Sequence, residues 1–140
     1  MNRVLTFSFL ILEIFCEMFA SADKKTIGKN GEDRCAKFLT EHGFTVLERN
    51  WRTKRGEIDI IAEKDNILVF VEVKTLPCGN AELLAHVLDK RKQKRISETA
   101  KCFLANNRKY NDRIIRFDVI VVDMPGFPSV YHIENAFLGL

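Results

Sequence analysis

The stretch from Gly56 to Lys74 constrains the fold of this 140-residue chain more than any other part. Two runs rich in Ile and Val flank the polar segment Lys64-Asp65-Asn66. β-branched residues favour strands, and a short polar break between two such runs is typical of a β-hairpin. The sequence therefore predicts an antiparallel hairpin in which Asp65 and Asn66 form a two-residue loop.

This register predicts a charged side and an apolar side of the hairpin. With Lys64 facing Ile67, Asp59 lies opposite Glu72. In the same register Glu57 lies opposite Lys74. Opposed residues share a face, with Cβ atoms about 5 Å apart, so the four charges gather on one side. The other side is expected to pack into a core and comprises Ile58, Ile60, Ala62, Val69, Val71 and Val73.

The charged side has two interpretations. Glu57 and Lys74 are expected to form an ion pair, whereas Asp59 and Glu72 bring two carboxylates together, which destabilises the fold unless a positive group lies between them. A bound divalent cation would supply that positive charge. The alternative is a solvated face, because charged strand residues commonly face water and a three-residue loop would change the pairing.

The composition excludes a disordered chain and points to a polyanionic partner. Hydrophobic residues make up 46% and charged residues 29%, as in a globular domain. The net charge is only +3, but the segment from His86 to Arg116 holds ten Lys or Arg against three Asp or Glu, a net charge of +7. Such a concentration of positive charge favours nucleic acid.

The four cysteines show no CxxC pair, so neither a zinc site nor a disulfide framework is indicated, and we expect reduced thiols in a cytoplasmic protein. Residues 1–25 complicate that location. An apolar run from Val4 to Leu12 and the small residues Ala20-Ser21-Ala22 resemble a secretory signal, which makes export the alternative. Glu13 and Glu17 interrupt it, and the run is too short to span a bilayer.

We therefore divide the chain into an N-terminal extension, residues 1–25, and a folded domain, residues 26–140. The extension is either an amphipathic helix or a signal-like segment. The domain begins with a predicted helix over 26–42, which Gly43 ends. The buried stripe of this helix holds Cys35, Ala36, Phe38 and Leu39. Glu32 shares that face and is expected to direct a third carboxylate at the hairpin, unless it only favours the helix dipole.

The remaining pattern predicts a strand over 45–52, a helix over 90–106, and strands over 114–123 and 130–134. Trp51 is expected in the core. Basic residues concentrate between the first strand and the hairpin and at the start of the second helix, where they either bind phosphates or form an ordinary solvated face. The candidate nucleic-acid-binding residues are Arg52, Lys54, Arg55, Lys90, Arg91, Lys92, Gln93, Lys94 and Arg95.

Two carboxylates, a nearby lysine and a further Glu suit phosphodiester hydrolysis. Oxygen ligands from Asp59 and Glu72 suit Mg²⁺ or Mn²⁺, which lower the pKa of bound water and neutralise charge on a phosphate. Lys74 would hold the attacking water and stabilise the transition state as an ammonium, or would deprotonate the water as a neutral amine.

At these positions the sequence resembles known nucleases. Asp59, twelve further residues and then Glu72-Val73-Lys74 resemble the PD-(D/E)xK signature. A longer set of motifs, spread from about residue 26 to the end, resembles the YraN family. These motifs are Gly28-Lys-Asn-Gly31-Glu32, Arg49-Asn50-Trp51-Arg52, Gly56 to Ala62, Val69 to Thr75, Lys92-Gln93, Arg116 to Val119 and Ile133 to Phe137.

The resemblance implies an α/β fold with a restriction-endonuclease-like core, a mixed five-stranded sheet flanked by helices, similar to archaeal Holliday junction resolvases. It also implies that Asp59, Glu72 and the Val73 carbonyl would hold the metal. Lys74 would serve the water, Glu32 would complete the site, and Lys92 and Gln93 would stand beside it. Leu76 and Cys78 depart from the family pattern.

Two functions follow as expectations. The first is a cytoplasmic, Mg²⁺-dependent nuclease of DNA that acts on branched structures, with the basic helix binding phosphates. The second is a non-catalytic nucleic-acid-binding accessory protein with the same fold. Junction-cutting enzymes commonly work as symmetric dimers, so a homodimer is a further expectation.

Overall fold

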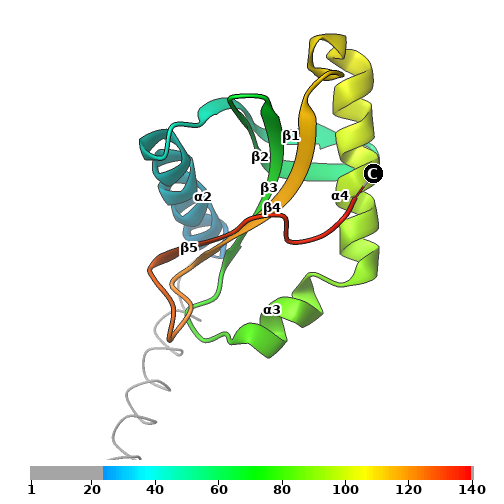
Figure 1. Cartoon of the computed structure of the whole chain (residues 1–140). Coiled ribbons are helices and arrows are strands. Elements are labelled where there is room, and N and C mark those ends of the chain that lie inside the picture. The colour runs from blue at the N-terminus through cyan, green and yellow to red at the C-terminus, as the bar shows by residue number, and fades with distance from the viewer. Residues whose placement is uncertain (1–23, 140) are drawn as a thin grey trace, which may run out of the picture.

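The computed structural model describes residues 24–139, which form a five-stranded mixed sheet between helices (Figure 1). Helix α2 (Lys24–Glu41) precedes β1 (Thr45–Thr53), β2 (Gly56–Lys64) and β3 (Ile67–Thr75). Helices α3 (Ala81–Val87) and α4 (Lys90–Asn106) and a short 3₁₀ helix, η1 (Arg108–Tyr110), lead to β4 (Ile114–Val122) and β5 (Val130–Ile133). This arrangement confirms the predicted fold class and is consistent with a restriction-endonuclease-like core.

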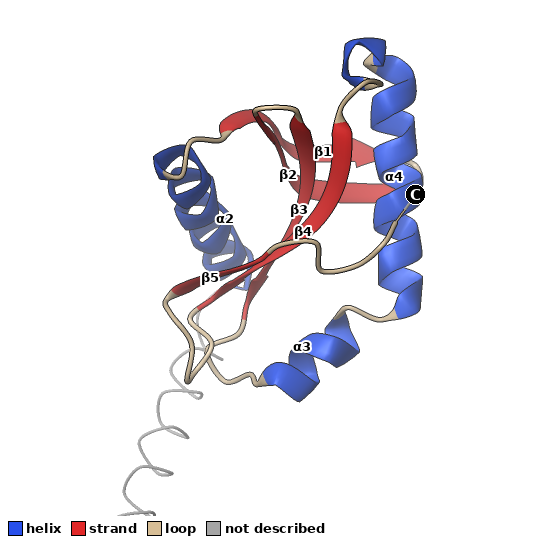
Figure 2. Cartoon of the chain, viewed as in Figure 1, coloured by secondary structure: helices blue, strands red, loops and turns tan. Residues whose placement is uncertain are grey.

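The strands follow chain order, β1-β2-β3-β4-β5, and only β3 and β4 are parallel. A parallel pair needs a crossover connection, and α3 and α4 provide it. In Figure 2, α2 lies on one side of the sheet, whereas α3 and α4 lie on the other. Strand β3 is therefore central, with β2 on one side and β4 on the other.

The predicted hairpin register is confirmed over its first half. Lys64 pairs with Ile67, and the ladder continues to Ile60 opposite Val71. Asp65 has a φ of 53°, a left-handed conformation of the kind that two-residue hairpin loops require. The loop length inferred from the sequence is therefore correct, and with it the faces of the residues between Ile60 and Val71.

Beyond Ile60 the ladder between β2 and β3 ends, although β2 continues to pair with β1 as far as Thr53 and Gly56. The predicted Glu57–Lys74 ion pair is therefore wrong: Glu57 pairs with Arg52 across β1 and β2, with 3.0 Å between Oε2 and Nε. Ile58 also departs from the predicted apolar side, since it packs with the α4 residues instead of the α2 residues.

Two hydrophobic clusters hold the layers together. Between α2 and the sheet, Cys35 and Leu39 pack on strand residues that include Ile60, Val69 and Val71. Between α4 and the sheet, Ile96, Ala100 and Phe103 pack on strand residues that include Phe70 and Phe117. Trp51 lies against this second cluster, 5.3 Å from the Phe103 ring, as predicted. The buried stripe predicted for the helix over 26–42 is confirmed.

Some expectations concern the N-terminal segment and the cysteines. The signal-like or amphipathic character of residues 1–23 lies outside the described residues. Cys35 and Cys102 are free thiols, but Cys78 is disulfide-bonded, so the expectation of reduced thiols is wrong at Cys78. Within residues 24–139, no helix has the length and apolar character needed to cross a bilayer.

Candidate active site

Asp59 and Glu72 lie where β2 and β3 part, and both side chains are buried. Asp59 is 8% exposed and Glu72 is 3% exposed. The Asp59 carboxylate takes the place of a ladder partner, because its Oδ2 accepts a hydrogen bond of 2.7 Å from the Val73 backbone N–H. Burial raises the pKa of Asp59 to about 7, and the neighbouring Glu72 charge adds to the rise, whereas the Val73 hydrogen bond opposes it. The two acids are thus neighbours, although they do not form the opposed ladder pair that the sequence predicted.

The two oxygens of Glu72 have different surroundings. Oε1 lies 2.8 Å from Lys74 Nζ and 2.9 Å from Lys92 Nζ, so two ammonium groups meet at one oxygen. Oε2 is buried and has no hydrogen-bond partner. A buried carboxylate oxygen without a donor is unfavourable, so this atom is available to a cation.

A divalent cation of the Mg²⁺ type fits these donors. Mg²⁺ is commonly held by one or two carboxylates and completes its shell with water or substrate oxygens. Asp59 and Glu72 supply the carboxylates, and the resemblance to nucleases adds the Val73 carbonyl. Within the described part of the chain, no group of three or more His, Cys, Asp or Glu side chains is arranged to hold a metal. An ion here would therefore depend on backbone, water or phosphate oxygens for its other ligands.

Glu32 reaches this region because α2 approaches β3 unusually closely. A Cβ at Gly31 would overlap the Thr75 hydroxyl oxygen, so glycine fits this approach without a shift of Thr75. The Glu32 charge contributes to raising the pKa of Asp59, after burial and Glu72. However, Glu32 Oε2 accepts a hydrogen bond of 2.8 Å from Asn50 Nδ2, and its side chain is not fully buried. Glu32 thus lies at the border of the acidic pair, held by β1.

A basic pocket adjoins the acidic pair. It has a volume of about 440 Å³ and lies between the β1–β2 turn and the start of α4. We call it the basic pocket, and it is lined by Arg52, Thr53, Lys54, Arg55, Gly56, Glu57, Lys92, Arg95 and Ile96. Lys92 belongs to both features, since it lines the pocket and contacts Glu72.

The structure gathers five of the nine predicted nucleic-acid-binding residues in this pocket: Arg52, Lys54, Arg55, Lys92 and Arg95. The others, Lys90, Arg91, Gln93 and Lys94, are not among its lining residues. Gln93 Nε2 donates a hydrogen bond of 2.9 Å to the Leu88 carbonyl oxygen. This bond stabilises the connection between α3 and α4. The Arg55 guanidinium is paired with Glu98 of α4 at 2.7 Å.

A second pocket of about 550 Å³ lies on the α2 side of β1. It shares Arg52 and Glu57 with the basic pocket and also includes Glu32, Arg49 and Asn50. Sequence reasoning assigned no role to Asn50, whose φ of 50° and bond to Glu32 place it here. The resemblance implied that Lys92 stands beside the site, but it did not indicate the contact with Glu72. No spacing pattern indicates either contact, because each joins segments that meet only in the folded chain.

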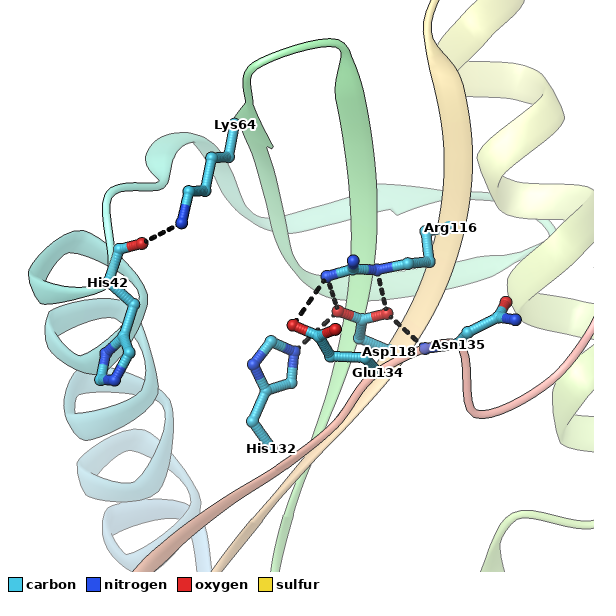
Figure 3. A network of polar contacts seen from close by, with 7 residues as sticks. All are labelled: His42, Lys64, Arg116, Asp118, His132, Glu134 and Asn135. Carbon is cyan, nitrogen blue, oxygen red and sulfur yellow. Dashed lines mark hydrogen bonds and ion pairs between the residues drawn. The ribbon is translucent and has the colours of Figure 1, made fainter.

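A separate polar network surrounds Asp118, which is fully buried on β4 (Figure 3). Arg116 donates two hydrogen bonds of 2.8 Å to its carboxylate, His132 Nε2 lies 2.7 Å away, and the Asn135 backbone N–H donates at 2.9 Å. Burial raises the pKa of Asp118, but these hydrogen bonds outweigh burial and lower it overall. Both oxygens of the Asp118 carboxylate have partners, so this network stabilises the fold instead of offering a vacant site.

Comparisons with known proteins agree with the resemblance seen in the sequence. Residues 31–122 match the profile of an uncharacterised protein family, UPF0102. A UPF0102 protein of Treponema pallidum is 49% identical over 120 residues, covering 83% of this chain and 95% of that protein. One of Treponema denticola is 47% identical, covering 80% and 95%, and one of Geobacter metallireducens is 40% identical, covering 84% and 96%. This chain is therefore a member of the UPF0102 family, also called YraN.

Proposed function

We propose that this protein hydrolyses phosphodiester bonds of DNA with the help of Mg²⁺ or Mn²⁺, and that it acts on branched DNA. The observation that carries the proposal is the pair of buried carboxylates, Asp59 and Glu72, beside two lysines at the edge of a basic pocket. Two buried acids of like charge destabilise a fold, so we expect such a pair to serve function instead of stability.

The residues of the chain divide the work of such a reaction. Arg52, Lys54 and Arg95 would bind backbone phosphates and hold the strand over the acidic pair. Asp59 and Glu72 would hold the divalent cation, which supplies a water of lowered pKa and neutralises negative charge on the phosphate. Lys74 would place its ammonium beside that water and stabilise the charge that develops on the phosphate oxygens.

A non-catalytic nucleic-acid-binding protein is the second candidate. One observation favours it: Lys74 and Lys92 already neutralise Glu72, so the site is held together without any added ion. The burial of Asp59 next to Glu72 favours the enzyme, because phosphate binding alone requires no paired carboxylates.

Cleavage assays with the full-length protein distinguish the two. Labelled linear, flapped and four-way-junction DNA would be incubated with Mg²⁺, Mn²⁺ or EDTA. Asp59→Asn and Lys74→Met are the test variants. Asp112→Asn and Lys101→Met are the controls, because they make the same charge changes at exposed positions away from the site.

We expect the wild-type protein and both controls to cut the junction or flap in Mg²⁺ or Mn²⁺ and not in EDTA. Asp59→Asn and Lys74→Met should each lower the rate at least about 100-fold, the scale of one transition-state contact or of general acid–base catalysis. Both variants should still shift the DNA in a gel. DNA binding by all proteins without cutting under any condition would establish the accessory function instead.

A further inference from the structure

Lys92 lies between the two parts of the proposed site. It comes from the first turn of α4, where Asp89 caps the helix by accepting a hydrogen bond from the Lys92 backbone N–H at 2.8 Å. Its ammonium lies 2.9 Å from Glu72 Oε1, yet its side chain is 28% exposed and also lines the basic pocket. The backbone of Lys92 is therefore fixed, while its flexible side chain can serve either neighbour.

Lys74 and Lys92 are not equivalent in this respect. Lys74 lies on the same strand as Glu72, two residues away and on the same face, so its ammonium stays near the carboxylate. Lys92 is brought in from another element, and among the described residues Glu72 is its only ion-pair partner. Departure of either lysine would leave one net negative charge on the ionised pair Glu72 and Asp59, and Lys92 is the lysine that also lines the basic pocket and can move there.

The local charge also indicates a competition. With Lys74 and Lys92 against Glu72 and an ionised Asp59, the charges of the inner site cancel before any ion arrives. A divalent cation at Glu72 Oε2 would then be repelled by the Lys92 ammonium at Oε1 of the same carboxylate, so the two cations disfavour each other. A phosphate in the basic pocket would attract Lys92 in the opposite direction, away from Glu72.

We propose that Lys92 couples nucleic-acid binding to divalent-cation binding: it holds Glu72 in the free protein and moves to a phosphate when nucleic acid enters the basic pocket. This inference rests on the proposed function, because it concerns the same two carboxylates. While Lys92 holds Glu72, the divalent cation binds weakly, and it binds more tightly once nucleic acid occupies the basic pocket. By linkage, each ligand raises the affinity for the other by the same factor.

Measurement of Mn²⁺ binding tests the coupling without relying on turnover. Free Mn²⁺ is followed by electron paramagnetic resonance within minutes of mixing at 4 °C. The titrations use full-length protein alone, protein with a 20-base-pair duplex, and duplex alone as the blank. The variants are Lys92→Gln, Lys92→Arg and Lys101→Gln, the last being a matched loss of charge at an exposed position on the same helix.

For the wild-type protein we expect the duplex to tighten Mn²⁺ binding at least about fivefold, the lower end of measured couplings. Lys92→Gln should bind Mn²⁺ about fivefold more tightly than the wild type without duplex, and its gain from the duplex should be smaller. Lys92→Arg should retain most of the wild-type gain, and Lys101→Gln should behave as the wild type. If Lys92 had only a structural role, its replacement by Gln would not raise the affinity of the protein for Mn²⁺.

Two opposite results are distinguishable. If the wild-type protein and Lys92→Gln bind Mn²⁺ equally and gain equally from the duplex, the coupling is refuted while the proposed hydrolysis stands. If neither protein binds Mn²⁺ with or without duplex, the proposed hydrolysis fails and the coupling fails with it.

Discussion

Two buried carboxylates of this protein, Asp59 and Asp118, have opposite effects on the stability of the fold. Asp118 is surrounded by donors and its pKa is lowered, whereas Asp59 lies beside another acid and its pKa is raised. A residue whose burial destabilises the fold is a candidate for function, and a residue whose burial stabilises it is a candidate for structure. This contrast separates the proposed site from the network of Figure 3.

Replacement of Asp59 by Asn should stabilise the protein when no metal is present. At pH 8 in EDTA the change removes a buried charge next to Glu72, and the amide oxygen can still accept the Val73 hydrogen bond. We expect the free energy of unfolding in urea to rise by about 1 kcal/mol. Added Mg²⁺ should stabilise the wild type alone, and the exposed control Asp112→Asn should change little. A lower stability of Asp59→Asn in EDTA would contradict this view of the site.

Replacement of Asp118 by Asn should have the opposite effect and a characteristic pH dependence. The groups facing Asp118 are Arg116, His132 and, through Arg116, Glu134. Breaking such a buried ionic network costs about 3 kcal/mol. Because the folded pKa of Asp118 is lowered, its contribution is complete above the unfolded value near pH 4 and is lost as the pH falls through the lower folded value.

Urea unfolding at pH 7, 5 and 3 measures this dependence. The difference in unfolding free energy between the wild type and Asp118→Asn should be similar at pH 7 and 5 and smaller at pH 3. A constant difference across all three values would show that the lost packing, and not the carboxylate charge, accounts for the effect.

At the scale of elements, the contact of α2 with β3 determines where Glu32 lies. Gly31 of α2 faces Thr75 of β3, whose hydroxyl oxygen is buried without a partner. Alanine in place of a helical glycine usually stabilises a helix, by about 1 kcal/mol. Here the added methyl group would overlap the hydroxyl, so steric exclusion outweighs the gain in helix propensity.

A double-mutant cycle tests this contact. We expect Gly31→Ala to lower the free energy of unfolding by about 1–3 kcal/mol, the range for overpacking. Thr75→Ala alone should be nearly neutral, since it removes an unsatisfied hydroxyl. In the double variant the loss should disappear, because the Gly31 Cβ position lies at ordinary contact distance, 3.6 Å, from the Thr75 Cβ. Urea unfolding of all four proteins measures it, and additive effects would disprove the steric explanation.

The sequence could predict the elements other than α3 and η1, and most of the hairpin, because alternation and turn chemistry are local. The register from Lys64 to Ile60 follows from the loop and the apolar pattern alone. The departure of β2 from β3 beyond Ile60 was not predictable, because it depends on β2 remaining paired with β1. For the same reason the Glu57–Lys74 pair was predicted wrongly, and the approach of Lys92 to Glu72 required the position of α4 on the sheet.

At the scale of the whole molecule, positive charge is concentrated in one region. The net charge of +3 conceals a concentration of cations around the basic pocket, where two elements far apart in sequence supply the lining. The positive side chains that line this pocket should therefore contribute more to nucleic-acid binding than the total charge of the chain does.

The salt dependence of DNA binding measures this difference. A triple variant, Arg52→Gln, Lys54→Gln and Arg95→Gln, should bind duplex DNA more weakly and reduce the slope of log affinity against log salt by about 0.9 for each phosphate that is no longer neutralised. A control with equal loss of charge, Lys37→Gln, Arg108→Gln and Lys109→Gln, lies outside the pocket lining. Fluorescence anisotropy between about 50 and 300 mM salt gives both slopes. Equal slopes for the two triple variants would mean that binding follows total charge.

Strand β3 is hydrogen-bonded to β4 along its whole length, from Ile67–Ile114 to Thr75–Val122. Glu72 and Lys74 thus belong to a segment whose backbone has little freedom to adjust, and only long side chains such as Lys92 and Arg52 can reorient. DNA that docks here must therefore bend to fit the protein, because the backbone of β3 does not adjust to the DNA. Nicked or branched DNA bends at its discontinuities more cheaply than a continuous duplex, which resists curvature over tens of base pairs. A preference for such interrupted molecules would then follow from the stiffness of the sheet, without any contact that reads the junction.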